Sequence, residues 1–288
     1  PTACVMQAGP GLVALHASCR VLVGCEARAD AGNPRLGPDP ASAVRPVRRC
    51  WPCGKGGVVK LMLLVMDEQR VILDHLYEMI RVHSGTCEIF RLNSSQQRNL
   101  GAFLASVAYR DYERIILFTR VKRQLSQLPV LRCIPGLVIL EHDACQNYMA
   151  ESKYRGAYSK LFASLPWARA IVSGCGVARR LQGEGVDAVF VSKGYDERLL
   201  RDLGRPRDVP VAFLGSFRSD AYAGRRAVLE RIAAATDLLV TRTSSGAEYL
   251  ELLNRIRIFV SADVGMGEYM IKNFEAMACG CTLQIGRA

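Results

Sequence analysis

Residues 267–281 read GEYMIKNFEAMACGC and predict a short helix that ends in a tight turn. Four apolar side chains recur at the spacing of one helical face: Ile271, Phe274, Met277 and Ala278. Gly280 is placed to end the helix, because glycine readily adopts the left-handed conformation that closes many helices. The following residues, 281–286, read CTLQIG and predict a strand. A helix that leads into a strand in this way is typical of an α/β fold.

Two glutamates bracket the apolar positions of this predicted helix. Glu268 and Glu275 are seven residues apart, which is about two helical turns, so both carboxylates are expected on one side of the helix. Solvent-exposed glutamates on a helix surface are common, and the spacing alone fits that interpretation as well as a binding site. The pair therefore needs support from the rest of the sequence.

From residue 58 onward, apolar runs alternate with amphipathic segments. Predicted strands cover 58–66, 86–92, 114–119, 136–143, 168–173 and 188–192, and then 211–217, 237–241 and 256–261. Predicted helices open at Asp67 and cover 93–109, 152–165, 177–185, 225–235 and 246–255. This alternation predicts parallel sheets with helices on both faces. The predicted fold class is therefore α/β, with two Rossmann-like series joined near residues 194–210.

The composition fits a chain of two ordinary α/β domains. It has 288 residues, of which 50% are hydrophobic, and no apolar run approaches the roughly 18 residues that span a bilayer. The net charge of +11 favours anionic partners, a group that includes sugar nucleotides, phosphorylated glycans, acidic lipid surfaces and nucleic acid. The eleven cysteines follow no disulfide-scaffold pattern, which favours a reducing cytoplasm.

Residues 1–57 differ from the rest of the chain. They are rich in Pro, Gly, Ala, Arg and Cys, and they show neither strand nor helix periodicity. CWPC at 50–53 has thioredoxin-like spacing, but a redox site needs a strand before it and a helix after it, and neither is predicted. GKGG at 54–57 lacks the spacing of a phosphate-binding P-loop. We expect a disordered leader or a spurious N-terminal extension.

The segments FLGSF (213–217) and IFVSADVGMGEYMIKNFEAMACG (258–280) resemble the GT-B glycosyltransferases, in particular the retaining family-4-like group with its "glycosyl transferases group 1" C-terminal domain. The resemblance implies two Rossmann-like domains that face each other across a cleft. Residues 58–196 would form the acceptor-side domain, and 197–288 the nucleotide-sugar-binding domain. It also implies that the second domain is incomplete, because members of the family continue through further elements.

The activity that this resemblance implies is transfer of a sugar from a nucleotide-sugar donor to a glycan or lipid-linked glycan acceptor, with retained anomeric configuration. The expected setting is bacterial cell-surface polysaccharide or lipopolysaccharide biosynthesis. The protein would act in the cytoplasm or at the inner face of the cytoplasmic membrane, with a peripheral contact to anionic lipid. The resemblance implies no metal, no cofactor and no nucleic-acid partner, since the nucleotide-sugar is itself the substrate.

The family pattern assigns donor-binding roles to several residues near the C-terminus. Glu275 stands where the family binds the nucleotide ribose, and Lys272 where many members have a basic residue. The loop after the first C-domain strand, with Gly215 and Ser216, and the Gly267 backbone would approach the donor. The usual Arg and Lys of that loop are replaced here by Ser216 and Ala221, and Arg218 is the nearest substitute, with Arg242 a weaker one.

The catalytic residues that the resemblance implies are Glu268, His142 and Asp143. Glu268 is shifted by one residue from the family's first glutamate position, which Gly267 occupies. His142 and Asp143 follow the apolar run LVIL, at the carboxyl end of a predicted strand, where ligands of parallel sheets bind. His142 would contact the transferred sugar, and Asp143 would orient it or contact the acceptor.

Three alternatives stay open at this point. SGCGVARR at 173–180 follows a predicted strand and opens a helix, as a nicotinamide-binding loop would, but it lacks the third glycine. A sugar-nucleotide epimerase is built on the same two-domain fold. A catalytically inactive basic protein that binds glycans or membranes is favoured by the missing Arg/Lys pair and by the shifted Glu268.

We predict that limited proteolysis trims the chain to near residue 58 without changing its melting temperature. A segment without core periodicity cannot offset an ordering entropy of about 1–2 kcal/mol per residue. Mass spectrometry of the trimmed product and thermal unfolding before and after cleavage check this. A protected leader, or a trimmed chain that no longer folds, would show that CWPC and its neighbours belong to the folded structure.

Overall fold

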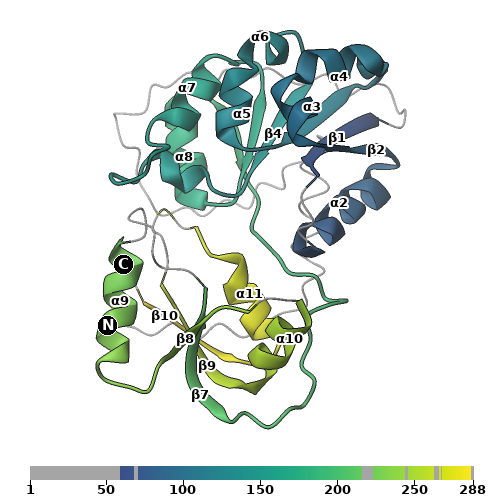
Figure 1. Ribbon diagram of the computed structural model, residues 1–288. Helices are drawn as coiled ribbons and strands as arrows, with labels where there is room; N and C mark the ends of the chain where they lie inside the picture. Colours follow the sequence, from purple (N-terminus) through teal and green to yellow (C-terminus); the bar gives the residue numbers. More distant parts are fainter. Residues whose placement is uncertain are drawn as a thin grey trace, which may run out of the picture.

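The computed structural model contains two parallel β-sheets covered by helices (Figure 1). The larger sheet has the strand order β2-β1-β3-β4-β5-β6, and the smaller one β10-β9-β7-β8. The structure describes residues 59–67, 71–215, 223–243, 246–262, 266 and 268–286. The α/β class and the two parallel sheets predicted from the sequence are confirmed. The two sheets with their helices are called the first half and the second half below.

The strands of the first half are β1 (Lys60–Met66), β2 (Thr86–Leu92), β3 (Arg114–Phe118), β4 (Leu137–Glu141), β5 (Arg169–Val172) and β6 (Asp187–Phe190). All neighbours pair in parallel. The central strands β1, β3 and β4 are almost continuously apolar and buried. A parallel sheet requires this, because helices cover both of its faces.

Helices cover both faces of the first sheet. They are α2 (Val71–Ser84), α3 (Ser94–Arg98), α4 (Leu100–Ser106), α5 (Val121–Ser126), α6 (Leu128–Leu131), α7 (Ala157–Ala163) and α8 (Cys175–Gly183), with short 3-10 helices at Tyr109–Asp111 and Ala144–Asn147. Alternate residues of β1 serve the two faces. Leu61 and Leu63 pack in one cluster with Tyr77 of α2, whereas Met62 and Leu64 belong to the cluster that contains α4 to α8.

Two helical predictions in the first half were wrong in detail, and two short helices were missed. The single helix expected at 93–109 is two helices, because Asn99 leaves the helical conformation at φ −127° and ψ 57°. The helix expected at 152–165 begins only at Ala157, since Gly156 adopts a left-handed φ of 72°. The short helices α5 and α6 were not predicted. Short helices like these carry too few apolar positions to show a clear period.

The second half contains β7 (Val209–Leu214), β8 (Leu239–Thr241), β9 (Ile256–Ala262) and β10 (Thr282–Gly286), with helices α9 (Ala223–Ala233), α10 (Gly246–Arg255) and α11 (Ile271–Ala278). Phe213 and Phe259 pack together in its core at a centroid distance of 6.3 Å. Helix α11 begins at Ile271, so Glu268 precedes the helix. The expectation that Glu268 and Glu275 share one side of a helix was therefore wrong.

The connection between the halves, residues 191–208, has no regular element but packs closely on the second half (Figure 1). Leu200 is buried in the core of that half. Asn254 of α10 accepts from the Leu203 amide at 2.6 Å and donates to the Arg201 carbonyl at 3.0 Å. Within the described ranges, no helix is long and apolar enough to cross a membrane.

We predict that Gly280→Ala lowers the melting temperature by about 2–8 °C. The reason is that a left-handed conformation costs about 1–2 kcal/mol for a residue with a β-carbon. Gly280 has a φ of 78° and closes α11 with two hydrogen bonds, from its own amide to Met277 and from Cys281 to Ala276. A β-carbon there would also collide with the side chains of Asp202 and Arg207.

Gly183→Ala is the matched control for thermal unfolding by circular dichroism. Gly183 ends α8, and no atom lies within 4 Å of where its β-carbon would be. This variant should melt at the wild-type temperature or slightly above it. Equal melting temperatures for both variants would contradict the role given to Gly280.

Candidate functional site

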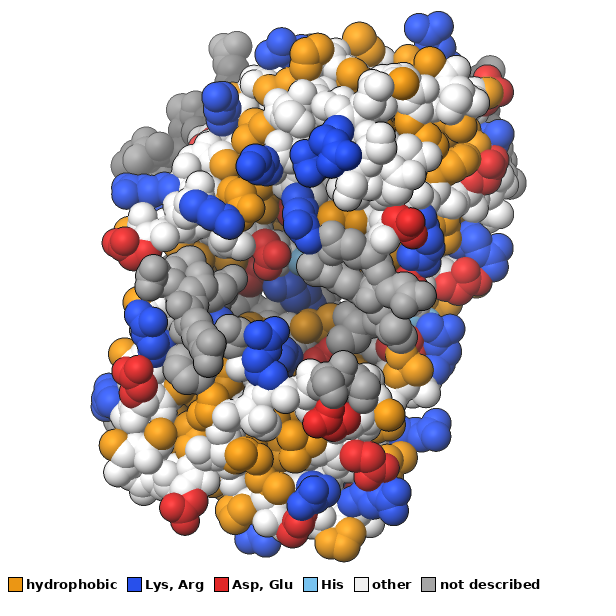
Figure 2. All heavy atoms as spheres, viewed as in Figure 1, with side chains coloured by type: hydrophobic (Ala, Val, Ile, Leu, Met, Phe, Trp, Pro, Cys, Tyr) orange, Lys and Arg blue, Asp and Glu red, His pale blue; other side chains and the backbone are white. Residues whose placement is uncertain are grey.

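The carboxyl ends of the strands in both halves carry the polar side chains of interest. Figure 2 shows a hollow between the two halves, with Lys, Arg, Asp and Glu side chains at its rim. His142 and Asp143 follow β4 in the first half, and Gly215 follows β7 in the second. This is the edge at which open parallel sheets bind their ligands.

Glu275 of α11 is only 1% exposed. Tyr249 of α10 donates from Oη to one carboxylate oxygen, Oε2, at 2.6 Å. The other oxygen, Oε1, is buried and has no hydrogen-bond partner among the residues that the structure describes. Burial raises the pKa of Glu275, and the hydrogen bond from Tyr249 and the charge of Lys272 offset part of the rise. A buried acceptor without a donor costs about 1–3 kcal/mol, so a donor that reached Oε1 would stabilise Glu275.

Lys272 links α11 to the end of β7. Its Nζ donates to the Leu214 carbonyl at 2.5 Å and lies 5.6 Å from the Tyr249 ring centroid. A β-carbon on Gly215 would lie 3.2 Å from this Nζ, so the glycine permits the close approach. The structure thus brings together three of the residues predicted to bind a donor, Gly215, Lys272 and Glu275. The other three, Ser216, Arg218 and Gly267, lie outside the described residues.

Positive charge gathers around Lys272. Burial lowers the pKa of Lys272, Glu275 opposes this, and the charges of Arg242 and Arg225 lower it further. Arg225, in the first turn of α9, is only 6% exposed and contacts Met270 just before α11. Sequence analysis missed Arg225, because RR at 225–226 looks like the ordinary polar face of an amphipathic helix. The cluster forms a positive site at the start of α11.

The start of α11 is itself suited to an anion. Its N-cap residue, Met270, makes no side-chain hydrogen bond to the first turn. In that turn, the side-chain amide of Asn273 is buried, and neither its Nδ2 nor its Oδ1 has a hydrogen-bond partner among the described residues. Free amides at a helix N-terminus attract negative charge.

The first half contributes His142 and Asp143 at the end of β4. The His142 ring packs edge-on against Phe118, with 5.0 Å between ring centroids, and is half-buried. The Asp143 side chain is exposed. The His142 carbonyl accepts from the Ser173 hydroxyl at 3.1 Å. Both residues therefore lie at the strand end where the sequence placed them.

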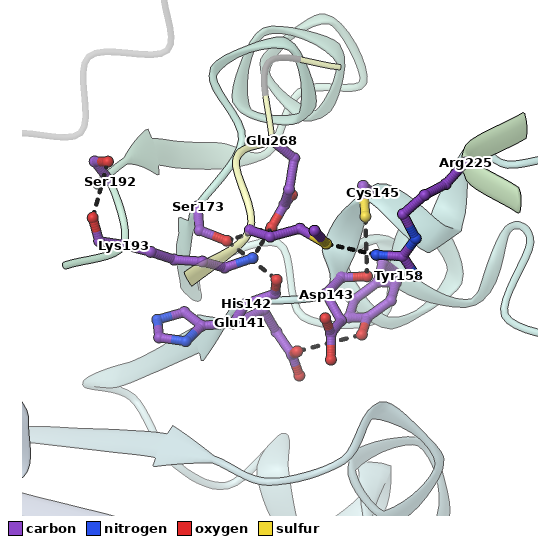
Figure 3. A network of polar contacts seen from close by, with 11 residues as sticks. Glu141, His142, Asp143, Cys145, Tyr158, Ser173, Ser192, Lys193, Arg225 and Glu268 are labelled. Atoms are coloured by element: carbon purple, nitrogen blue, oxygen red, sulfur yellow. Dashed lines mark hydrogen bonds and ion pairs between the residues drawn. The ribbon is translucent and has the colours of Figure 1, made fainter. Parts of the chain in front are cut away.

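Glu141, the last residue of β4, is a buried carboxyl that sequence analysis treated only as part of the strand. Gln124 donates to its Oε1 at 2.9 Å, and Tyr158 donates to its Oε2 at 3.2 Å. Burial raises the pKa of Glu141 well above its ordinary value, and the charge of Asp143 raises it further. Burial also raises the pKa of Tyr158. Glu141 and Tyr158 are thus hydrogen-bonded next to His142 and Asp143 at the end of β4 (Figure 3).

Glu268 does not lie with Glu275. It reaches into the first half, where it is 1% exposed and its Oε1 accepts from Ser173 Oγ at 2.5 Å and from Lys193 Nζ at 2.7 Å (Figure 3). Ser173 Oγ lies between Glu268 Oε1 and the main-chain carbonyl of His142, so Glu268 does not contact the His142 ring. Lys193, which follows β6, was missed because its partner is 75 residues away in the chain.

A scan against models of known protein families and a search of curated proteins find no match to this chain. Within the described ranges, no group of three or more His, Cys, Asp or Glu side chains is arranged to hold a metal ion. The second half offers a carboxylate acceptor beside several cations, and the first half offers a histidine and a carboxylate. Such a combination can bind a polyhydroxylated anion.

We predict that Glu275→Gln gains stability relative to the wild type as the pH rises from 4 to 8. Because burial raises the pKa of Glu275 in the folded protein, the folded state retains a proton that the unfolded chain has released. Wild-type stability therefore falls as the pH passes from the unfolded pKa through the folded one, and glutamine escapes this loss. The difference should therefore grow as the pH rises through the folded pKa and then level off.

Urea unfolding at several pH values measures this difference. Glu251→Gln is the matched control, because Glu251 is on α10 but exposed, paired with Arg205 at 3.2 Å. Its stability should follow the wild-type pH curve. A pH-independent difference in stability between Glu275→Gln and the wild type would show that folding does not raise the pKa of Glu275.

Proposed function

We propose that this protein is a GT-B glycosyltransferase that moves a sugar from a nucleotide-sugar donor to a glycan or glycolipid acceptor. The observation that carries the proposal is the buried Glu275, held by Tyr249 through one oxygen while the other lacks a donor among the described residues. A carboxylate oxygen in this position suits the vicinal hydroxyls of a ribose. The position of Glu275 before AMACG, at 276–280, is the one that the family uses for this contact.

The cations of the second half would bind the donor diphosphate. Lys272, Arg225 and Arg242 act electrostatically on one site, and the N-cap side chain of Met270 makes no hydrogen bond to the start of α11. Arg225 would then take the place of the basic pair that is missing at Ser216 and Ala221. A bound diphosphate would compensate the mutual repulsion of these cations, which favours an anionic ligand over a neutral one.

The first half would face the transferred sugar. His142 would donate a hydrogen bond to a sugar hydroxyl or phosphate, and Asp143 would orient it or contact the acceptor. The bond from the anomeric carbon to the diphosphate breaks, and the acceptor oxygen bonds to the same face of that carbon. The acceptor proton passes to the leaving diphosphate, so the mechanism assigns no protein nucleophile and the configuration is retained.

We place this activity in bacterial cell-surface polysaccharide or lipopolysaccharide biosynthesis, on the cytoplasmic side of the membrane. The net charge of +11 supports peripheral contact with anionic lipid and attraction of an anionic donor. An inactive glycan- or membrane-binding protein is the second candidate. It is favoured by Glu268, whose carboxylate is engaged by Ser173 and Lys193 in the first half.

We predict that Glu275→Ala weakens binding of the preferred nucleotide-sugar about ten- to a hundredfold. The variant loses a charge-assisted contact worth roughly 1.5–3 kcal/mol. Calorimetry with UDP-, GDP-, dTDP- and ADP-sugars first identifies the donor and then measures the variant. His142→Ala should keep the wild-type dissociation constant and lose turnover, because His142 lies in the other half.

Three outcomes count against the proposal. An unchanged dissociation constant for Glu275→Ala would remove the ribose assignment. Donor binding without transfer or donor hydrolysis would favour the inactive glycan-binding protein. Interconversion of the labelled donor without an acceptor would instead identify an epimerase.

A further inference from the structure

We propose that Glu268 is a positioning residue that anchors the second half to the carboxyl edge of the first sheet. The Glu268 anchor consists of Glu268, Ser173 and Lys193. Its two hydrogen bonds, at 2.5 Å to Ser173 and 2.7 Å to Lys193, both end on Oε1 (Figure 3). The Glu268 carboxylate thus contacts residues that follow β5 and β6. Both strands belong to the first half, whereas Glu268 belongs to the second.

The backbone around Glu268 supports the same contact. Glu268 forms an isolated antiparallel bridge with Gly174, and the Gly176 amide donates to the Met266 carbonyl at 2.7 Å. A β-carbon on Gly174 would lie 2.7 Å from Glu268 Oε2, and one on Gly176 would lie 2.5 Å from the Met266 oxygen. At Gly176 the obstacle is backbone, so only glycine allows this approach, whereas a side chain at Gly174 would displace the Glu268 carboxylate. The Gly-x-Gly of SGCGVARR is thereby explained by this packing.

Burial gives the anchor its strength. Glu268 is 1% exposed, and the Lys193 side chain is 10% exposed, so both charges have given up most of their hydration. A buried ion pair adds little net stability by itself, but removing one partner leaves the other charge buried and unpaired, which is strongly unfavourable. Separating the halves at this point would leave both groups unpaired before water reaches them.

The position of the anchor connects it to the candidate site. Ser173 also lies 3.1 Å from the His142 carbonyl, so the anchor reaches the end of β4 as well. Two residues after Glu268, Met270 contacts Arg225 and precedes α11. The anchor therefore sets how the strand end that carries His142 faces the helix that carries Glu275. Its effect on turnover rests on the proposed function, but its effect on the contact between the halves does not.

Hydrogen exchange in the ligand-free full-length protein tests the contact directly. The amide of Gly176 bonds across the halves, whereas the amide of Ala178 bonds within α8, to Gly174 at 2.9 Å. In Glu268→Gln, exchange at Gly176 should accelerate at least tenfold while Ala178 stays unchanged. Ser173→Ala, a milder change, should accelerate Gly176 to a smaller extent. Glu251→Gln, on the exposed face of α10, should leave both amides at the wild-type rate.

Unchanged exchange at Gly176 in both Glu268→Gln and Ser173→Ala would overturn the anchor. Equal acceleration at Gly176 and Ala178 would also overturn it, because that result describes fraying of α8. These readouts need no substrate. If the wild type transfers no sugar, the proposed function fails, while the exchange rates still decide whether the anchor exists.

A double variant separates positioning from catalysis. Glu268→Gln should lower kcat/KM for transfer. The double variant Glu268→Gln, Lys193→Met should have a kcat/KM at least tenfold higher than Glu268→Gln alone, because the unpaired ammonium is gone. A carboxylate that contacts the substrate cannot be replaced by deleting its partner. A double variant no more active than Glu268→Gln would therefore overturn the positioning role.

Discussion

The structure depends on the cost of removing carboxylates from water. Glu141, Glu268 and Glu275 are almost completely buried, and each needs hydrogen-bond donors from other elements. An ionised group in the protein interior is tolerated only with such partners. Helices α5 and α7 supply them to the first, the ends of β5 and β6 to the second, and α10 to the third. The need for partners therefore fixes how these elements are arranged.

The three buried glutamates differ in what each carboxyl group contacts. Glu141 is buried at the end of β4, and burial raises its pKa. One oxygen of Glu275, beside Lys272, has no hydrogen-bond partner among the residues that the structure describes. Glu268 joins the two halves. A polar site thus forms from residues that alternating sheets and helices bring to a common edge, although they are far apart in sequence.

The strands could be predicted from the sequence because a buried parallel strand is a run of apolar residues. The predictions for β2 and α10 match the observed bounds. The start of α11 could not be read from periodicity, since Met270 continues the apolar pattern but is extended, at φ −71° and ψ 145°. Three polar residues of the candidate site were missed for a different reason: Tyr249, Lys193 and Arg225. Each contacts a residue far away in the sequence, and no local pattern indicates such a contact.

The connection between the halves has a consequence for protein engineering. Tyr195 and Leu200 pack in the second core, Leu203 bonds to Asn254, and Arg207 donates to the Ile256 and Cys279 carbonyls. Residues 195–208 therefore act as part of the second half and not as a neutral tether. A chimaera that exchanges this half for that of another protein has to carry the segment with it. A fusion joined downstream of Arg207 would expose the base of the transplanted sheet.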